Sequence, residues 1–278
     1  MSHSKGGRKT HQGNKKINIG DKGKEVLKNL DENSLVVQQF RVYAAELDDK
    51  HDRYERILKI GRDITIESKR IIYLLHSIDK KSKQESVLNE AKIRLQNVAQ
   101  NNFKCIALEL ENEDGYQYLR AYRGSLEEYI EAFTFYHYLN SNNLEDWTEL
   151  EKMITYTITD RPEVQTINTL VTPHEYILGI ADLTGELMRR CINNLTQDTA
   201  SCYQMCNFVR NMYTGFLSCK ILNCKEMNRK LSTLKQSLCK IENVCYTIKV
   251  RGSEIPKHIL IDVATKNYEE NDEGYQAY

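Results

Sequence analysis

Apolar residues recur at steps of three and four along most of the chain, which is the spacing of helices with one buried face. The first such pattern covers about residues 35–78. At 1.5 Å per residue, an unbroken helix of that length would be about 65 Å long. The pattern therefore predicts either one very long helix or two helices, with Gly61 as the expected break.

Further helical patterns fill the rest of the chain. They cover about residues 85–110, 116–139, 144–156, 173–194, 201–221 and 227–251. The helix near residue 173 has the clearest start, because Thr172, Pro173 and Glu175 match a capping box. Residues 161–170 read as an internal loop, and no segment shows a convincing strand pattern. We therefore expect a single all-α bundle with no sheet.

The last predicted helix has the most regular apolar spacing. From Met227 to Ile248 its apolar residues alternate steps of four and three over three heptads, as in a coiled-coil seam. Two interpretations remain open at this point. The seam packs inside the bundle, or it packs against a partner subunit.

Composition narrows the class of protein. The chain has 278 residues but only 3 prolines, roughly a fifth of the usual ~5% share. Because proline breaks helix interiors and is common in turns, this scarcity agrees with long helices and disfavours a β-sandwich or a Pro-rich disordered chain. No apolar run approaches the ~20 residues of a membrane helix, so we expect no membrane partner.

Charge is balanced overall, with 39 basic and 39 acidic side chains, but uneven at the ends. Residues 1–20 contain lysine and arginine and no acid, and residues 267–278 contain acids and no base. Such segments cannot bury enough apolar surface to fold. We expect a disordered basic tail over 1–34, one helical domain over 35–262 and a disordered acidic tail over 263–278.

The basic tail is compatible with nuclear import, with nucleic-acid contact, or with a purely solubilising role. The first 34 residues lack the apolar core of a signal peptide, so we expect the chain to stay inside the cell.

The third helical pattern carries the first pair of candidate functional residues. Glu128 and Glu131 lie about 60° apart on a helix that is apolar on both sides and therefore buried on both sides. Two buried carboxylates need compensation, either from a divalent cation or from basic side chains. A pair of structural, ion-paired glutamates is the alternative interpretation.

The helix near residue 173 carries a second pair, Asp182 and Glu186, one turn apart. Two glycines beside them, Gly179 and Gly185, are unfavourable in a helix interior, which suggests a close approach of another group to this face. A solvated polar face is the alternative here. Four carboxylates in two pairs are typical of a magnesium site acting on a phosphodiester.

Five separated blocks of the sequence, in the right order, resemble the translin family. They are HDRYER at 51–56, RDITIESKR at 62–70, LEEYIEA at 126–132, LGIADLTGELMR at 178–189, and the segment 231–258 that contains KVRGSEIPKH. The resemblance covers about residues 35–260. It implies an all-helical translin-type fold of about seven helices.

The resemblance also implies a function. It points to a hetero-oligomeric, roughly octameric shell formed with translin around RNA, in the cytoplasm and nucleus. In this complex the chain is expected to be the magnesium-dependent endoribonuclease, with Mn²⁺ able to substitute. The implied substrate is the passenger strand of siRNA duplexes, whose cleavage promotes RISC activation, with tRNA precursor fragments as a further class. The family's catalytic, metal-binding carboxylates fall on Glu128, Glu131, Asp182 and Glu186.

Basic residues near these carboxylates are candidates for binding RNA phosphates, with plain surface or ion-paired roles as the alternative. They are Lys69, Arg70, Arg120, Arg123, Arg189 and Arg190. Two other functional classes compete with the nuclease. One is a non-catalytic scaffold that stabilises translin and assists nucleic-acid binding, and the other is a general helical interaction protein that uses the 227–248 seam.

Overall fold

The computed structural model describes residues 20–79, 81–160, 162–195, 198–219, 225–252, 254 and 256. The described residues divide into two compact units, one ending at Asp52 and the other beginning at Arg53. Most of the predicted basic tail and all of the acidic tail lie outside the described residues. Within the predicted tail, Asp21–Lys28 form a short helix, α1.

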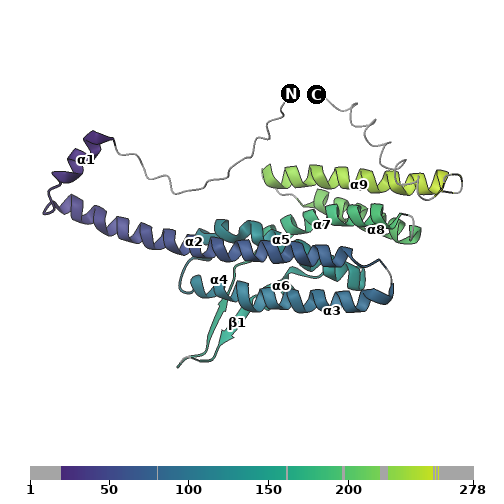
Figure 1. The fold of residues 1–278 in the computed structure, drawn as a ribbon, viewed down its shortest axis with the longest axis horizontal. Helices are drawn as coiled ribbons and strands as arrows, with labels where there is room; N and C mark the ends of the chain where they lie inside the picture. Colours follow the sequence, from purple (N-terminus) through teal and green to yellow (C-terminus); the bar gives the residue numbers. More distant parts are fainter. Residues whose placement is uncertain are drawn as a thin grey trace, which may run out of the picture. The chain divides into compact units, whose positions relative to one another are not determined.

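Helix α2 (Leu35–His76) is one uninterrupted helix, which confirms the first of the two predicted alternatives and excludes a break at Gly61 (Figure 1). Gly61 has a packing role instead. A Cβ atom built there would lie 2.9 Å from the Ser125 hydroxyl, on helix α5 (Gly115–Ser141). Glycine at this position lets α2 and α5 approach closely without interrupting α2.

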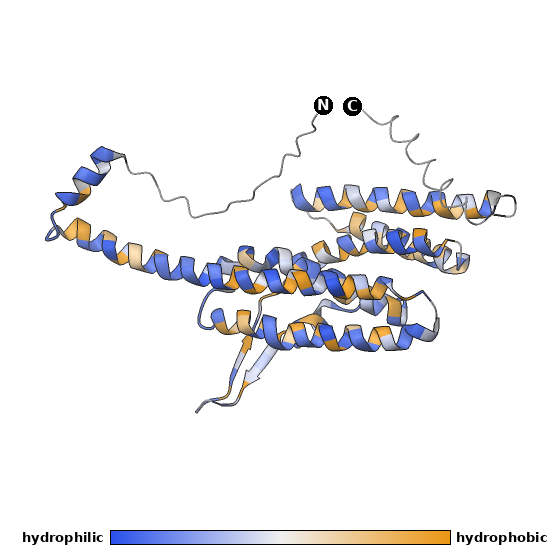
Figure 2. Ribbon diagram, in the orientation of Figure 1, coloured by the Kyte–Doolittle hydropathy of each residue, from blue (hydrophilic) through white to orange (hydrophobic). Residues whose placement is uncertain are grey.

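The first unit carries an exposed apolar stripe at the start of α2. Leu35, Val36, Phe40 and Leu47 are each at least 65% exposed. Figure 2 shows hydrophobic residues at the beginning of α2. Isolated exposed hydrophobic side chains are normal, but a contiguous stripe is typical of an interaction surface.

The second unit is a helical bundle, as predicted. Helix α3 (Lys81–Asn97) continues through a π-helical turn, η1 (Val98–Phe103), into α4 (Lys104–Glu109). After α5 come α6 (Trp147–Met153), α7 (Pro173–Asn194), α8 (Thr199–Ser218) and α9 (Lys225–Arg251). Helix α7 begins at Pro173, as the capping pattern predicts.

Helix α5 forms the centre of the unit. It packs against α7 on one side and α3 on another, and α7 in turn packs against α8 and α9. Its aromatic residues Tyr122, Tyr129, Phe133 and Phe135 are almost completely buried. This confirms that the helix is buried on both sides, the premise of the argument about its carboxylates.

The expectation of no sheet is wrong in one place. Strands β1 (Thr155–Ile158) and β2 (Gln165–Asn168) form an antiparallel hairpin beside α4 and α6. Tyr156 pairs with Ile167, both are buried, and the Tyr156 hydroxyl donates a 2.6 Å hydrogen bond to the Ala99 carbonyl. The strand residues are mostly β-branched or aromatic, but four residues are too few for alternation to be recognised in the sequence.

The regular seam of α9 packs inside the bundle. Met227, Leu234, Leu238 and Ile241 are buried, and α9 contacts α7 and α8. The structure thus favours the intramolecular interpretation of this seam.

Candidate functional site

Helices α5 and α7 approach each other closely at Gly179. A Cβ atom at this position would lie 2.5 Å from Ile130 Cγ2 and 3.1 Å from the Glu127 carbonyl oxygen. The close approach inferred from the sequence is therefore present at Gly179. It is absent at Gly185, where a Cβ atom would meet nothing within 4 Å among the described residues.

This contact places the two acidic pairs within electrostatic range of each other. Burial raises the pKa of Glu131 to about 8, and the negative charges of Asp182, Glu186 and Glu128 add to this rise. Such repulsion requires short separations, because charge–charge interactions weaken with distance. Among the described residues, the Glu131 carboxylate has no hydrogen-bond or ion-pair partner.

Glu128 and Asp182 each have a lysine partner. Lys69 of α2 places its Nζ 3.0 Å from Glu128 Oε1, and Lys230 of α9 places its Nζ 2.7 Å from Asp182 Oδ2. One lysine precedes its carboxylate in the sequence, and the other follows its carboxylate. They also compensate part of the negative charge around Glu131, as the ion-pair interpretation of the sequence anticipated.

Lys230 is a site residue that the sequence analysis missed. Its buried Nζ also lies 2.6 Å from Glu127 Oε2 and 3.0 Å from the Leu178 carbonyl. Burial alone would lower the pKa of Lys230, but the hydrogen bonds and charges of Asp182 and Glu127 raise it overall. A signal was present, because this lysine lies three residues after Met227 on an otherwise apolar face.

Glu127 and Lys230 form a buried ion pair beside the four predicted carboxylates. The side chains of Lys230 and Glu127 are only 9% and 10% exposed. Burial raises the pKa of Glu127, and Lys230 offsets part of this rise. Each group therefore depends on the other to remain charged in this environment.

Glu186 is held by a second missed residue, His76 at the end of α2. His76 Nε2 lies 2.5 Å from Glu186 Oε2, and the imidazole packs against the Phe135 ring at 4.9 Å. Burial would raise the pKa of Glu186, but the hydrogen bond and charge of His76 lower it overall. The spacing of 110 positions between the two residues hides this contact from sequence patterns.

Two further predicted cations lie at or near the site. Arg189 places Nη1 3.5 Å from Glu186 Oε2. Arg120 lies along a groove of about 580 Å³ between α2 and α5, which Glu128 also lines. Arg62 lines the same groove and was not predicted, although it falls within the recognised 62–70 block.

The remaining predicted cations have other surroundings. Arg70 pairs with Glu67 on its own helix at 3.4 Å. Arg123 lies among three carboxylates at 3.2–3.6 Å, those of Glu127, Glu175 and Glu226. Arg190 lines a different cavity, at the end of α7.

The donor set fits a hard divalent cation in its chemistry. It consists of carboxylates, the ligands that Mg²⁺ prefers, and Glu131 lies in excess negative charge without a hydrogen-bond or ion-pair partner among the residues that the structure describes. In the described part of the chain, no three acidic, histidine or cysteine side chains are placed together closely enough to hold one ion. Instead of a metal ion, basic side chains contact three of the four carboxylates.

Comparison with known proteins agrees with this architecture. A family model described as "Translin family" matches residues 52–252. Translin-associated protein X of Pongo abelii is 42% identical over 250 residues, covering 85% of this chain and 86% of the relative. The homolog of that protein in Schizosaccharomyces pombe is 27% identical over 239 residues, covering 82% of this chain and 94% of the relative.

A solved structure shows the same fold. A chain of the crystal structure titled apo-NeC3PO superposes with a TM-score of 0.56 at 18% identity, covering 78% of this chain and 97% of that chain. Among the residues that the structure describes, no helix combines the length and apolar character needed to cross a lipid bilayer.

Proposed function

The chain belongs to the translin family, and from that premise we propose that it is the catalytic subunit of a magnesium-dependent endoribonuclease assembled with translin. The observation that carries the proposal is the state of Glu131. Its carboxylate lies within the field of three others, has a pKa raised to about 8, and lacks a partner among the described residues. A divalent cation would relieve this repulsion.

Glu128, Glu131, Asp182 and Glu186 are the residues that would hold Mg²⁺, or Mn²⁺ in its place. When bound, the metal lowers the pKa of a water molecule and neutralises charge that develops on the scissile phosphate. The other side chains orient these ligands. Lys230 fixes Asp182 and His76 fixes Glu186, in the manner of outer-shell residues at metal sites.

RNA would reach the carboxylates along the groove between α2 and α5. Arg62 and Arg120 line this groove, and Glu128 lies on it. Their guanidinium groups are suited to bind successive backbone phosphates, a contact that positions a strand without reading its sequence. In this proposal Lys69 contributes both to the phosphate contact and to holding Glu128.

The proposed partner is translin, in a roughly octameric shell that encloses RNA. Three relatives bear the name Translin-associated protein X, which supports the association. The proposed substrates are the passenger strand of siRNA duplexes, with RISC activation as the consequence, and tRNA fragments. The proposed location is both cytoplasm and nucleus.

A non-catalytic scaffold is the second candidate function. Its supporting observation is that Glu128, Asp182 and Glu186 each have a basic partner, at 3.0, 2.7 and 2.5 Å. In that case the carboxylates only stabilise the bundle, and the chain serves translin as a structural subunit.

Cleavage by the assembled complex separates the two candidates. Glu131→Gln and Asp182→Asn should each lower Mg²⁺-dependent cleavage of a labelled RNA by at least about 100-fold, because each removes a ligand charge. Glu163→Gln, at an exposed carboxylate between the two strands, is the matched control. Light scattering would verify assembly. Cleavage that survives both site variants in intact particles would establish the scaffold instead.

A further inference from the structure

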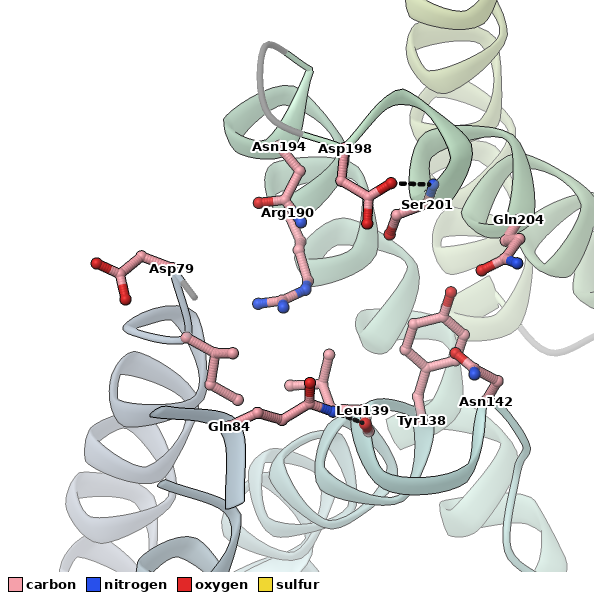
Figure 3. A pocket seen from close by; sticks show the side chains of 11 residues that line it. Asp79, Gln84, Tyr138, Leu139, Asn142, Arg190, Asn194, Asp198, Ser201 and Gln204 are labelled. Carbon is pink, nitrogen blue, oxygen red and sulfur yellow. Dashed lines mark hydrogen bonds between the residues drawn. The ribbon is translucent and has the colours of Figure 1, made fainter. Parts of the chain in front are cut away.

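A second polar cavity lies where α5 and α7 end and α8 begins. Its volume is about 640 Å³, and side chains from the α2–α3 connection, α3, α5, α7 and α8 line it. Figure 3 shows Arg190 directed into the open space, with Asp198 and Ser201 on one side and Tyr138 and Gln204 on another. The proposed cleavage site does not use this cavity.

Arg190 forms no direct ion pair in the described part of the chain. Its one hydrogen bond there, from Nη1 to the Leu75 carbonyl, is long at 3.5 Å. Burial lowers the pKa of Arg190, yet a guanidinium remains charged throughout the physiological range. A half-buried guanidinium that lines a polar cavity without a direct ion-pair partner is suited to bind an anionic ligand.

The two acidic residues of the cavity do not supply this partner. The Asp198 carboxylate caps α8, where it accepts a 3.0 Å hydrogen bond from the Ser201 backbone amide. Asp79 pairs with Lys83 at 3.2 Å. The charge of Asp198 is near enough to raise the pKa of Arg190, although burial outweighs this effect, and neither carboxylate forms a direct ion pair with Arg190 among the described contacts.

The rest of the lining is neutral and rich in hydrogen-bonding groups. Burial raises the pKa of the Tyr138 hydroxyl, and the nearby positive charge of Arg190 offsets part of this rise. Asn142, Asn194 and Gln204 contribute carboxamides. Each carboxamide offers both a donor and an acceptor, the combination found on the edges of nucleobases.

We propose that this cavity binds a phosphate-bearing nucleotide, with Arg190 on the phosphate and the carboxamides on the base. The phosphate comes either from a free nucleoside monophosphate or from the phosphorylated end of an RNA strand. The choice of a nucleotide over other anions rests on the proposed nuclease function. Arg190 follows Glu186 by one turn of α7, so the bound nucleotide would lie beside the carboxylate site.

Calorimetry tests this proposal. Uridine and adenosine 5′-monophosphates are titrated, without divalent metal, into the assembled complex that contains the full chain. The nucleotides should bind, and the corresponding nucleosides should bind at least about ten-fold more weakly, because they lack the charge-assisted contact. Arg190→Gln should weaken nucleotide binding by a similar factor. Arg229→Gln, at an exposed arginine of α9, is the matched control.

A second variant guards against loss of folding. Gln204→Glu places a negative charge in the cavity from an exposed position of α8 and should also weaken nucleotide binding. The proposal for free mononucleotides would be overturned if they fail to bind, or if they bind equally to wild type and Arg190→Gln. The cavity proposal as a whole would then depend on whether 5′-phosphorylated RNA binds through Arg190.

Short RNAs with and without a 5′-phosphate identify the source of the ligand. These are titrated into the Glu131→Gln complex, in which cleavage is expected to be lost. Tighter binding of the phosphorylated strand that depends on Arg190 assigns the cavity to RNA ends, and preference for the free monophosphate assigns it to mononucleotides. Equal binding of both RNAs together with no mononucleotide binding overturns the cavity proposal. Cleavage measured on the wild-type complex tests the nuclease proposal separately.

Discussion

Glu131 is the residue at which the stability of the bundle and the proposed binding of a metal ion favour different protonation states. It lies on a helix that is buried on both sides, and the three carboxylates around it oppose its ionisation. Neutral and ionised forms of Glu131 therefore have different consequences. The protonated side chain is the more stable form in the bundle without a metal ion, and the ionised side chain is the form that would bind a cation.

Replacing Glu131 by glutamine should change how stability depends on pH. The folded-state pKa of about 8 exceeds the ordinary value of 4.5. Between these values the folded protein retains a proton that the unfolded chain releases, so wild-type stability falls as pH rises. The variant lacks this group, so its stability should not show this fall. The unfolding free energy of the variant relative to wild type should therefore rise by about 1–3 kcal/mol between pH 5 and pH 8.5.

Urea unfolding across that pH range measures the difference. The other titrating groups are common to both proteins and cancel. Parallel stability curves for the two proteins would show that Glu131 ionises normally in the folded state.

Replacing Lys230 by methionine should destabilise the fold strongly. The change leaves Glu127 buried without its partner at 2.6 Å, and removal of one member of a buried pair typically costs about 3–5 kcal/mol. Adding Glu127→Gln should recover part of the loss, because the uncompensated charge is then removed. Denaturant unfolding measures both, with Lys235→Met at an exposed position of α9 as control. No recovery in the double variant would contradict this account.

The residues found by sequence reasoning and those it missed differ in the range of their contacts. Glu128, Glu131, Asp182 and Glu186 belong to short-range helical pairs, so their spacing alone marks them as candidates. His76 reaches Glu186 across 110 positions, and Lys230 reaches Asp182 across 48. Contacts of that range depend on how helices pack, which periodicity within one helix does not specify.

At the scale of the elements, the approach of α5 and α7 determines how near the two acidic pairs lie to each other. Gly179→Ala should push the helices apart, since the new methyl group would lie 2.5 Å from Ile130 and 3.1 Å from a backbone oxygen. We expect a loss of about 1–3 kcal/mol in unfolding free energy. Because the acidic pairs would separate, the proposed cleavage should also fall.

Gly185→Ala is the matched control for this substitution. It lies in the same helix with open space around its Cβ position, and alanine is the better helix former. Its unfolding free energy should be unchanged or higher by up to about 1 kcal/mol. Thermal and urea unfolding of the two variants side by side provide the measurement. Equal effects at both glycines would show that helix propensity, and not close packing, explains Gly179.

The elements themselves were largely predictable. Long amphipathic helices with clear starts, such as α7 at Pro173, follow from spacing and capping residues. The β-hairpin was missed because Thr155–Ile158 is too short to show alternation and directly follows a helix. Gly61 was misread because glycine marks both helix breaks and close helix contacts, and only the position of Ser125 on α5 distinguishes them.

At the scale of the whole molecule, the apolar stripe at the start of α2 should govern association. Phe40 and Leu47 are 67% and 65% exposed. The purified chain should therefore self-associate, and Phe40→Ser with Leu47→Ser should shift it to smaller species in light scattering. Gln39→Ser, at an exposed polar position of the same segment, should leave the distribution unchanged. An unchanged distribution in the double variant would place the association elsewhere.

Magnesium should stabilise the complex if the carboxylates bind it. A ligand that binds only the folded state raises the melting temperature. Addition of Mg²⁺ at pH 8 should raise it for wild type but less for Glu131→Gln, and chelation with EDTA should reverse the change. Differential scanning fluorimetry measures both steps. An identical response in the two proteins would assign the Mg²⁺ effect to another site.

One consequence follows from the position of Lys69 and His76 on the same helix. They lie about two turns apart on α2, and they contact carboxylates on two different helices, Glu128 of α5 and Glu186 of α7. A slide of α2 along its axis by a single turn, about 5.4 Å, would separate both carboxylates from their partners on α2 in the same movement. Glu128 would lose the compensating charge of Lys69 and Glu186 would lose the hydrogen bond of His76, so the axial position of α2 would affect both acidic pairs together.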